Sequence, residues 1–202
     1  MSISSNDLLP LINATVPRQP PPNSLGAVGR IVGMTAAVHP NVARVTAALT
    51  DGGADPARVS RLQVLPEGVH TAAAAAAALG VEVGQIANSL VFEAVTGEAV
   101  EPLLVLTSGA HRVDPAVVAA AVGADEIRRA KPAFVKEATG QVIGGVAPVG
   151  HPAPLRTLVD RALAAYGEIW AAGGIPAAVF PTTFAELVAV TGGEPAIVEQ
   201  PA

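Results

Sequence analysis

Apolar residues recur at helical spacing in five segments of the chain, and a glycine follows the end of each pattern. Thr71 and Asp114 stand where a residue caps the first turn, and Pro115 and Pro132 stand at first helical positions. These features predict helices over residues 41–53, 71–80, 113–123, 131–140 and 182–193.

Strand-like apolar runs separate the predicted helices. NSLVFEA (88–94) and PLLVLTSG (102–109) flank a turn at residues 96–98, and their near-continuous apolar character favours a sheet covered on both faces. Shorter strands are predicted at residues 60–65, 154–160, 175–180 and 195–200. About seven or eight strands mixed with about five helices, without a dividing linker, predict a single α/β domain of the α+β type with a mixed sheet.

Residues 1–33 show neither the helical nor the strand periodicity of apolar residues. They include VPRQPPPNSLG, whose three consecutive prolines favour an extended and solvated backbone. We therefore predict a flexible N-terminal extension over residues 1–33 and a folded domain over residues 34–202. Met34 opens the folded part, so it is either the true translation start or an internal residue that follows a real extension.

Composition restricts the classes of partner. The chain has 202 residues, a net charge of −5, 14% charged residues and no cysteine. A protein that covers many phosphates is usually basic, so we expect no DNA partner and only a small, local contact with any nucleic acid. No apolar run reaches the roughly 18 residues that span a bilayer, so we expect no membrane partner. The absence of cysteine fits a reducing compartment, and we expect a cytoplasmic location.

The common catalytic and cofactor motifs are absent from the sequence. The four histidines, His39, His70, His111 and His151, lack metal-site spacing. The chain also has no Walker loop, no dinucleotide fingerprint and no nucleophile elbow, so we expect neither a cofactor nor a metal. What remains is the loop TGQVIGGVAPVGHP (139–152), whose bare backbone is either a plain connection or a surface that approaches a ligand closely.

Five segments occur in a recognisable order and spacing: QIANSLVFEA, EPLLVLTSGAHRVD, EATGQVIGGVAPVGH, LRTLVDRAL and IWAAGG. In these segments the chain resembles the YbaK/EbsC-like family. That family includes free-standing aminoacyl-tRNA deacylases and the editing domain of bacterial prolyl-tRNA synthetases. The resemblance covers roughly residues 39–200 and implies a mixed, barrel-like β-sheet flanked by helices.

The resemblance also implies an activity, namely hydrolysis of the ester that joins a wrong, small amino acid to the terminal ribose of a tRNA. The implied partners are the 3′ end of a mischarged tRNA and an aminoacyl-tRNA synthetase. In such enzymes the substrate's own hydroxyl and a positioned water react, while backbone donors stabilise the developing oxyanion. Gly144 and Gly145 would let backbone N–H groups approach the scissile carbonyl.

Asn88 departs from the family pattern I-x-K-[ST]-L-V-F, in which active members carry a lysine. A lysine contacts a phosphate or carbonyl as a point charge, whereas Asn88 hydrogen-bonds without charge. Ala172 and Val179 stand near the glycine pair, where members of the family often carry polar residues, and this difference implies a smaller and more apolar pocket. Two functions stay open, an active deacylase and a non-catalytic module that binds an aminoacyl-tRNA end, a nucleotide or a synthetase.

Five further residues complete the site that the resemblance implies, all of them as substrate-binding residues: Arg112, His151, Asp160, Gly173 and Gly174. Each has a structural alternative. An arginine forms surface ion pairs, an aspartate before a helix caps it, and a histidine between glycine and proline is often solvated. A glycine pair can form a tight turn, and an asparagine can begin a strand.

Limited proteolysis tests the predicted extension. Exposed termini without periodic structure are cut first, so a protease should remove residues 1–33 and leave a folded domain that begins near Met34. Mass spectrometry of the stable fragment identifies the cut site. Unfolding of the remainder after that cut would contradict the prediction.

Overall fold

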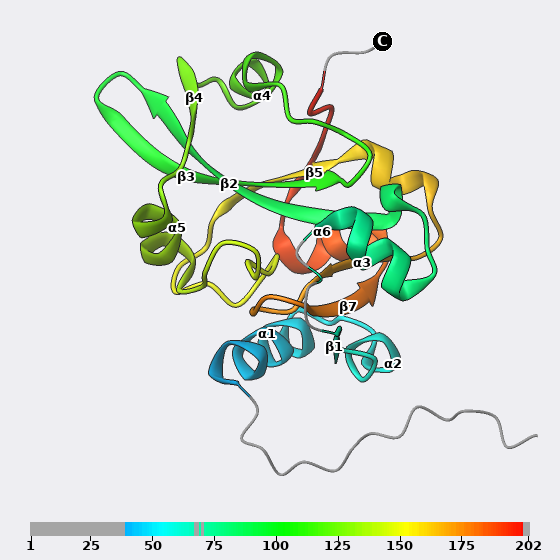
Figure 1. The fold of residues 1–202 in the computed structure, drawn as a ribbon. Coiled ribbons are helices and arrows are strands. Elements are labelled where there is room, and N and C mark those ends of the chain that lie inside the picture. Colours follow the sequence, from blue (N-terminus) through cyan, green and yellow to red (C-terminus); the bar gives the residue numbers. More distant parts are fainter. Residues whose placement is uncertain (1–38, 67–68, 70, 200–202) are drawn as a thin grey trace, which may run out of the picture. The chain divides into compact units, whose positions relative to one another are not determined.

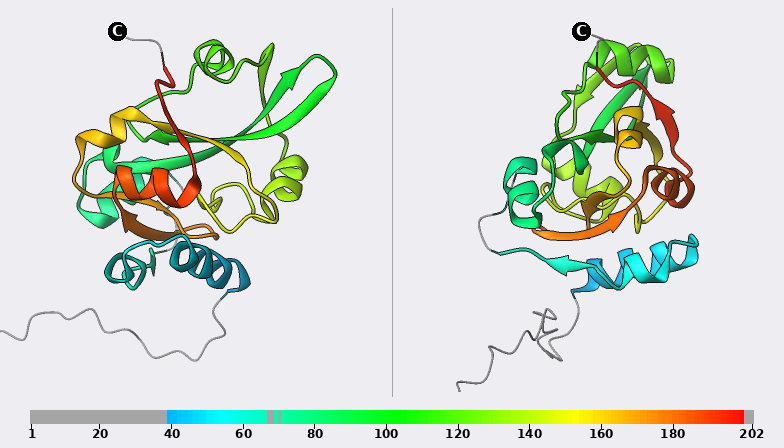
Figure 2. Two further views of the ribbon diagram at one scale, coloured as in Figure 1. Left: turned by 180° about the vertical axis from the view of Figure 1, so that it is seen from behind. Right: turned by 90° about the vertical axis from the view of Figure 1, so that its right-hand side faces the viewer.

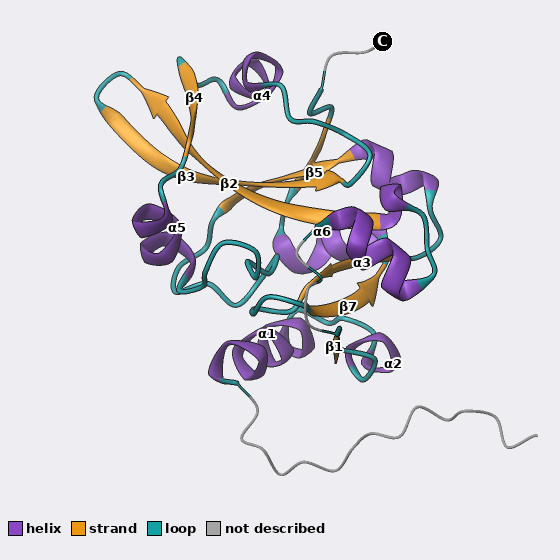
Figure 3. Ribbon diagram, viewed as in Figure 1, coloured by secondary structure: helices purple, strands orange, loops and turns teal. Residues whose placement is uncertain are grey.

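The helices expected from the sequence form in the computed structural model, which describes residues 39–66, 69 and 71–199 (Figure 3). The helices are α1 (Pro40–Asp51), α2 (Pro56–Val59), α3 (Ala72–Leu79), α4 (Pro115–Val122), α5 (Pro132–Thr139) and α6 (Phe184–Thr191). Thr71 accepts a hydrogen bond from the Ala74 N–H, and Asp114 accepts one from the Ala116 N–H, so both cap helices as predicted. With four residues, α2 is too short to leave a periodic pattern in the sequence.

Eight strands form one mixed sheet, which confirms the predicted fold class (Figure 1). They are β1 (Gln63–Val64), β2 (Ile86–Thr96), β3 (Ala99–Ser108), β4 (Glu126–Arg129), β5 (Arg156–Asp160), β6 (Ile169–Ala172), β7 (Ala178–Thr182) and β8 (Glu194–Ala196). Their order is β1-β7-β6-β2-β3-β5-β8, and β4 pairs with β2 outside this path. The strand expected at residues 60–65 covers only two residues in the structure. Strand β4 was not predicted, because three of its four residues are charged and it contains no apolar run.

Strand β2 is shared by three partners. It pairs along residues 87–96 with β3 in an antiparallel hairpin. On its other edge, Ile86 and Ala87 pair with β6, while residues 92–95 pair with β4. Among the described residues, the stretch from Asn88 to Val91 therefore has no strand partner on this second edge.

Alternation along β3 explains why its sequence is almost wholly apolar. Leu103 and Val105 face one core cluster together with α4, while Leu104 and Leu106 face another together with α1 and α6. Figure 2 shows α4 and α6 on opposite sides of this part of the sheet. All four side chains are fully buried, which confirms a sheet covered on both faces.

The predicted extension, residues 1–33, lies outside the described residues, so the proposed domain boundary stays a prediction. Within the described residues, no helix combines the length and apolar character needed to cross a bilayer.

Candidate functional site

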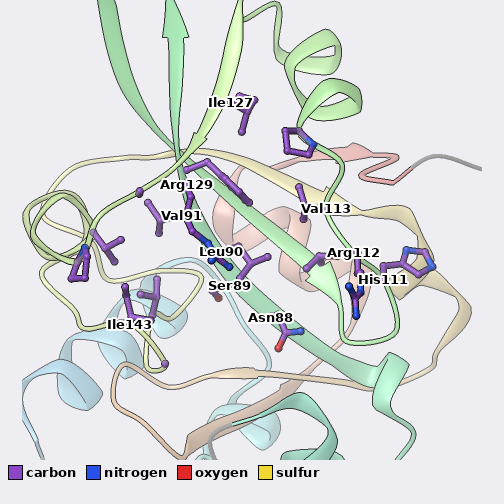
Figure 4. Close-up of a pocket in the computed structure, with 18 residues that line it drawn as sticks. Asn88, Ser89, Leu90, Val91, His111, Arg112, Val113, Ile127, Arg129 and Ile143 are labelled. Atoms are coloured by element: carbon purple, nitrogen blue, oxygen red, sulfur yellow. The ribbon is translucent and has the colours of Figure 1, made fainter.

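A hollow of about 740 Å³ opens beside the unpaired stretch of β2 (Figure 4). Its walls come from β2, the loop after β3, β4 and the glycine loop. Its charged or titratable side chains are His111, Arg112 and Arg129, and no Asp or Glu among the described residues lines it. In a chain with a net charge of −5, this hollow concentrates positive charge and suits an anionic ligand.

A smaller hollow of about 270 Å³ adjoins the first. Its walls are mostly apolar and include Trp170 and several alanines. Ala172 and Val179 line it, in agreement with the small apolar pocket expected from the sequence. Six residues line both hollows, which places their junction between β2 and the glycine loop: Asn88, Ser89, Leu90, Ile143, Gly144 and Val146.

Ser89 presents polar groups at this junction. The Ile86 carbonyl accepts from Gly109 beyond β3, whereas the Val95 carbonyl accepts from Asp125 on the β4 side. Because backbone groups alternate between the two edges of a strand, the N–H and carbonyl of Ser89 face the unpaired edge. The Ser89 hydroxyl is also buried without a hydrogen-bond partner among the described residues.

The two loop glycines differ in what they do. Gly144 is exposed at φ +88°, lines both hollows and has open space where a Cβ would stand. Gly145 is buried, and its Cβ would lie 2.6 Å from the Pro176 nitrogen. Its N–H already donates to the Val142 carbonyl at 3.0 Å. The expectation that Gly145 offers a donor to substrate is therefore corrected, and Gly144 alone of the pair faces the site.

Asp160 is a structural anchor in this arrangement. Asp160 is 2% exposed, and its carboxylate accepts from the Ser108 N–H at 3.0 Å, the Thr107 hydroxyl at 3.3 Å and the Ala162 N–H at 3.0 Å. It therefore caps the turn after β5 and fastens the end of β3. Asp160 lines neither hollow, so the expectation of direct substrate binding is replaced by a positioning function.

His111 connects this anchor to the large hollow. Its Nδ1 lies 2.9 Å from Asp160 Oδ2, and its Nε2 lies 3.2 Å from Glu199 Oε1. The Nδ1 contact lacks hydrogen-bond geometry. The imidazole therefore lies between two carboxylates, on the loop that carries Arg112.

Arg112 lines the large hollow as expected, and its backbone N–H donates to Glu199 Oε2 at 3.0 Å. Its guanidinium forms no ion pair with the described residues, so the surface ion pair considered from the sequence is not found among them. Asn88 is the third residue of β2 and is half-buried at the junction of the two hollows. The structure thus brings Asn88, Gly144 and Arg112 to one place.

His151 lies apart from these residues. It lines a separate hollow of about 300 Å³ between the end of the glycine loop and α6, and neither of the other two hollows. Burial lowers the pKa of His151 and outweighs the nearby carbonyls of Thr139 and Pro148, neither of which meets hydrogen-bond geometry with the ring. The expectation that His151 orients the substrate is therefore corrected, because the side chain is packed on the scaffold behind the loop.

Gly173 and Gly174 also contact the scaffold and line neither hollow. The Gly173 N–H donates to the Ala178 carbonyl at 2.7 Å, and the Gly174 carbonyl accepts from the Asn41 side chain at 3.2 Å. A Cβ on Gly174 would lie 3.0 Å from the Asn41 carbonyl oxygen. The pair forms a tight turn against α1, which corrects the expectation of a pocket wall.

Three residues of the site were not expected from the sequence: Ser89, His111 and Arg129. Ser89 and His111 occur inside the segments NSLVFEA and EPLLVLTSGAHRVD, so their positions in these motifs could have indicated them. Arg129 lies on β4, which has no sequence pattern of its own. No group of three or more potential metal ligands occurs among residues 39–66, 69 and 71–199.

Comparison with known proteins identifies the family. A family model described as aminoacyl-tRNA editing domain matches residues 66–190, more than half of the chain. The chain belongs to this family. The editing domain therefore contains both hollows and most of their lining residues.

Individual relatives agree with this assignment. A proline–tRNA ligase of Stenotrophomonas maltophilia (strain K279a) is 37% identical over 93 residues, which cover 46% of this chain and 16% of the ligase. The chain thus matches about a sixth of the length of such ligases. A crystal structure described as a candidate trans-editing enzyme for prolyl tRNA synthetase is 41% identical, with a TM-score of 0.70, and the match covers 82% of this chain and all of that one. A scaffold from computational epitope grafting is 38% identical, with a TM-score of 0.71, over 81% of this chain and 100% of the scaffold.

The buried position of Gly145 predicts a stability effect. An alanine Cβ would press on the backbone of Pro176, and overpacking of this kind costs about 1–3 kcal/mol, so we expect Gly145→Ala to lower the melting temperature clearly. Gly167→Ala is the matched control, because that position is open and has no positive φ. Equal melting temperatures for the two variants in thermal unfolding would contradict this packing.

The pKa of His151 predicts a pH effect. Its pKa is lower in the folded chain than the roughly 6.5 of an unfolded one, so the unfolded state binds more protons as the pH falls through that range. Stability should therefore decrease from about pH 7.5 to about pH 5.5, and it should decrease less in His151→Gln. Melting temperatures across this range provide the measurement, and parallel curves for the two proteins would speak against the burial effect.

Proposed function

We propose that the chain hydrolyses the ester between a small amino acid and the 3′-terminal ribose of a mischarged tRNA. The observation that carries the proposal is the junction of two unlike hollows at Asn88 and Gly144. An aminoacyl-tRNA end has an anionic nucleotide on one side of the ester and an amino acid on the other. The cationic hollow suits the nucleotide, the small apolar hollow suits the side chain, and the ester then lies at the junction.

The chemistry of this site depends on positioning. A water oxygen bonds to the ester carbonyl carbon, and the ribose oxygen leaves with a proton, which yields a free amino acid and a deacylated tRNA. We assign the backbone N–H groups of Gly144 and Ser89 to the developing oxyanion, because Gly145 is engaged within its own turn. Asn88 then orients the ester or the ribose by hydrogen bonds, with no side-chain nucleophile involved.

Family membership supports this proposal, as does the relative described as a candidate trans-editing enzyme for prolyl tRNA synthetase. The proposed substrate implies action in the cytoplasm, with a synthetase as the source of the mischarged tRNA. A second function is favoured by one observation, the uncharged Asn88 in place of the family lysine. In that case the domain binds an aminoacyl-tRNA end, a nucleotide or a synthetase without turnover.

Hydrolysis of a panel of tRNAs mischarged with small amino acids tests the proposal. We expect the wild-type protein to deacylate at least one of them, and Asn88→Lys to change that rate little or to lower it by crowding the junction. The control is Ala120→Lys, which adds the same charge on the exposed side of α4, away from both hollows.

The opposite result supports the binding module. The wild-type protein would then show no hydrolysis, and the Asn88→Lys variant would gain it. This result would make the protein a weakened relative of the active deacylases. One charge-assisted hydrogen bond contributes roughly 1.5–3 kcal/mol, so that gain should be about tenfold to hundredfold.

A further inference from the structure

Arg129 lies at the large hollow without an explanation in the fold. Residues alternate along β4, so Ile127 and Arg129 share one face and Glu126 and Arg128 share the other. On the outer face, the Arg128 guanidinium lies 2.6 Å from Glu126 Oε2. The Arg129 guanidinium has no ion pair or side-chain hydrogen bond among the described residues, although it lines the hollow.

The direction of the side chain adds to this. In Figure 4, Arg129 extends from β4 toward Ser89 and Leu90, while Arg112 lies on the loop after β3. The two guanidinium groups thus line the large hollow from different elements. Asn88, on β2, lines the same hollow.

The surroundings of the two arginines differ. Arg112 follows His111, and its own N–H binds the carboxylate of Glu199, so an acidic group already lies beside it. Arg129 pairs in register with Phe92 and shares its face with the buried Ile127. The described residues that line the hollow include no carboxylate, so none of them balances the charge of the Arg129 guanidinium.

We infer that Arg129 binds the phosphodiester that precedes the terminal adenosine of the tRNA, and so supplies from β4 the positive charge that Asn88 does not supply from β2. The inference rests on the proposed function for its ligand. A guanidinium holds a phosphate through two parallel hydrogen bonds and keeps its charge at any physiological pH. The hollow contains no carboxylate among its described lining residues to compete with the phosphate.

Comparison of two substrates distinguishes a phosphate contact of Arg129 from a general disturbance of the site. One is a mischarged tRNA, and the other is the same amino acid esterified to adenosine, which has no phosphate. For Arg129→Ala we expect KM for the tRNA to rise about tenfold with kcat nearly unchanged, and hydrolysis of the aminoacyl adenosine to stay as in the wild type. Arg128→Ala is the matched control on the opposite face of the same strand, and it should alter neither reaction.

Binding of uncharged tRNA at several salt concentrations gives a readout independent of catalysis. The slope of log K against log salt is negative, and loss of one phosphate contact should reduce its magnitude by about 0.7 in Arg129→Ala. Arg129→Lys should keep the wild-type slope. Equal slopes in the wild type, Arg129→Ala and Arg128→Ala would overturn the inference, as would equal losses of Arg129→Ala on both esters. A wild-type protein that binds tRNA with this Arg129-dependent slope yet hydrolyses no ester refutes the deacylase proposal and leaves the Arg129 contact supported. Absence of both binding and hydrolysis refutes both.

Discussion

One strand edge can pair with only one partner at each point, and this constraint shapes the site. On the edge of β2 opposite β3, β6 takes the first two residues and β4 takes residues 92–95. The stretch from Asn88 to Val91 is left between them, and its side chains line the large hollow. Backbone groups that form no ladder bond must find another partner, so this gap is a natural place for a polar ligand.

The surrounding segments are fixed by contacts that avoid the gap itself. Asp160 fastens the end of β3, and the Asp114 N–H donates to the Val198 carbonyl, so both ends of the loop with His111 and Arg112 are held. On the other side, Gly145 packs on Pro176 and leaves Gly144 in the open. Rigid supports of this kind let a few polar groups act without reorganisation when a ligand arrives.

Features that are local in sequence could be predicted, and those that depend on tertiary packing could not. Caps such as Thr71 and Asp114 act on the turn that follows them, so the sequence alone located these helices. The glycines at 145 and 174 are closely approached by backbone from distant segments, which a sequence pattern does not reveal. The site shares this limit, since Asn88, Arg112 and Gly144 follow from family motifs, whereas Arg129 reaches the hollow only through the pairing of β4 with β2.

The overall charge determines how a tRNA could be held here. Affinity for nucleic acid grows with the number of phosphates neutralised, and a chain of net charge −5 has few basic side chains available for such contacts. In the large hollow the cationic side chains among the described residues are Arg112 and Arg129, so the contact would cover the last nucleotides and little of the helical stem. Such an interface distinguishes substrates through what occupies the small apolar hollow, because the phosphates are the same in every tRNA. Under the proposed function, discrimination of the amino acid would lie in the packing around Trp170 and the alanines beside it, and the arginines would set how long a tRNA end remains bound.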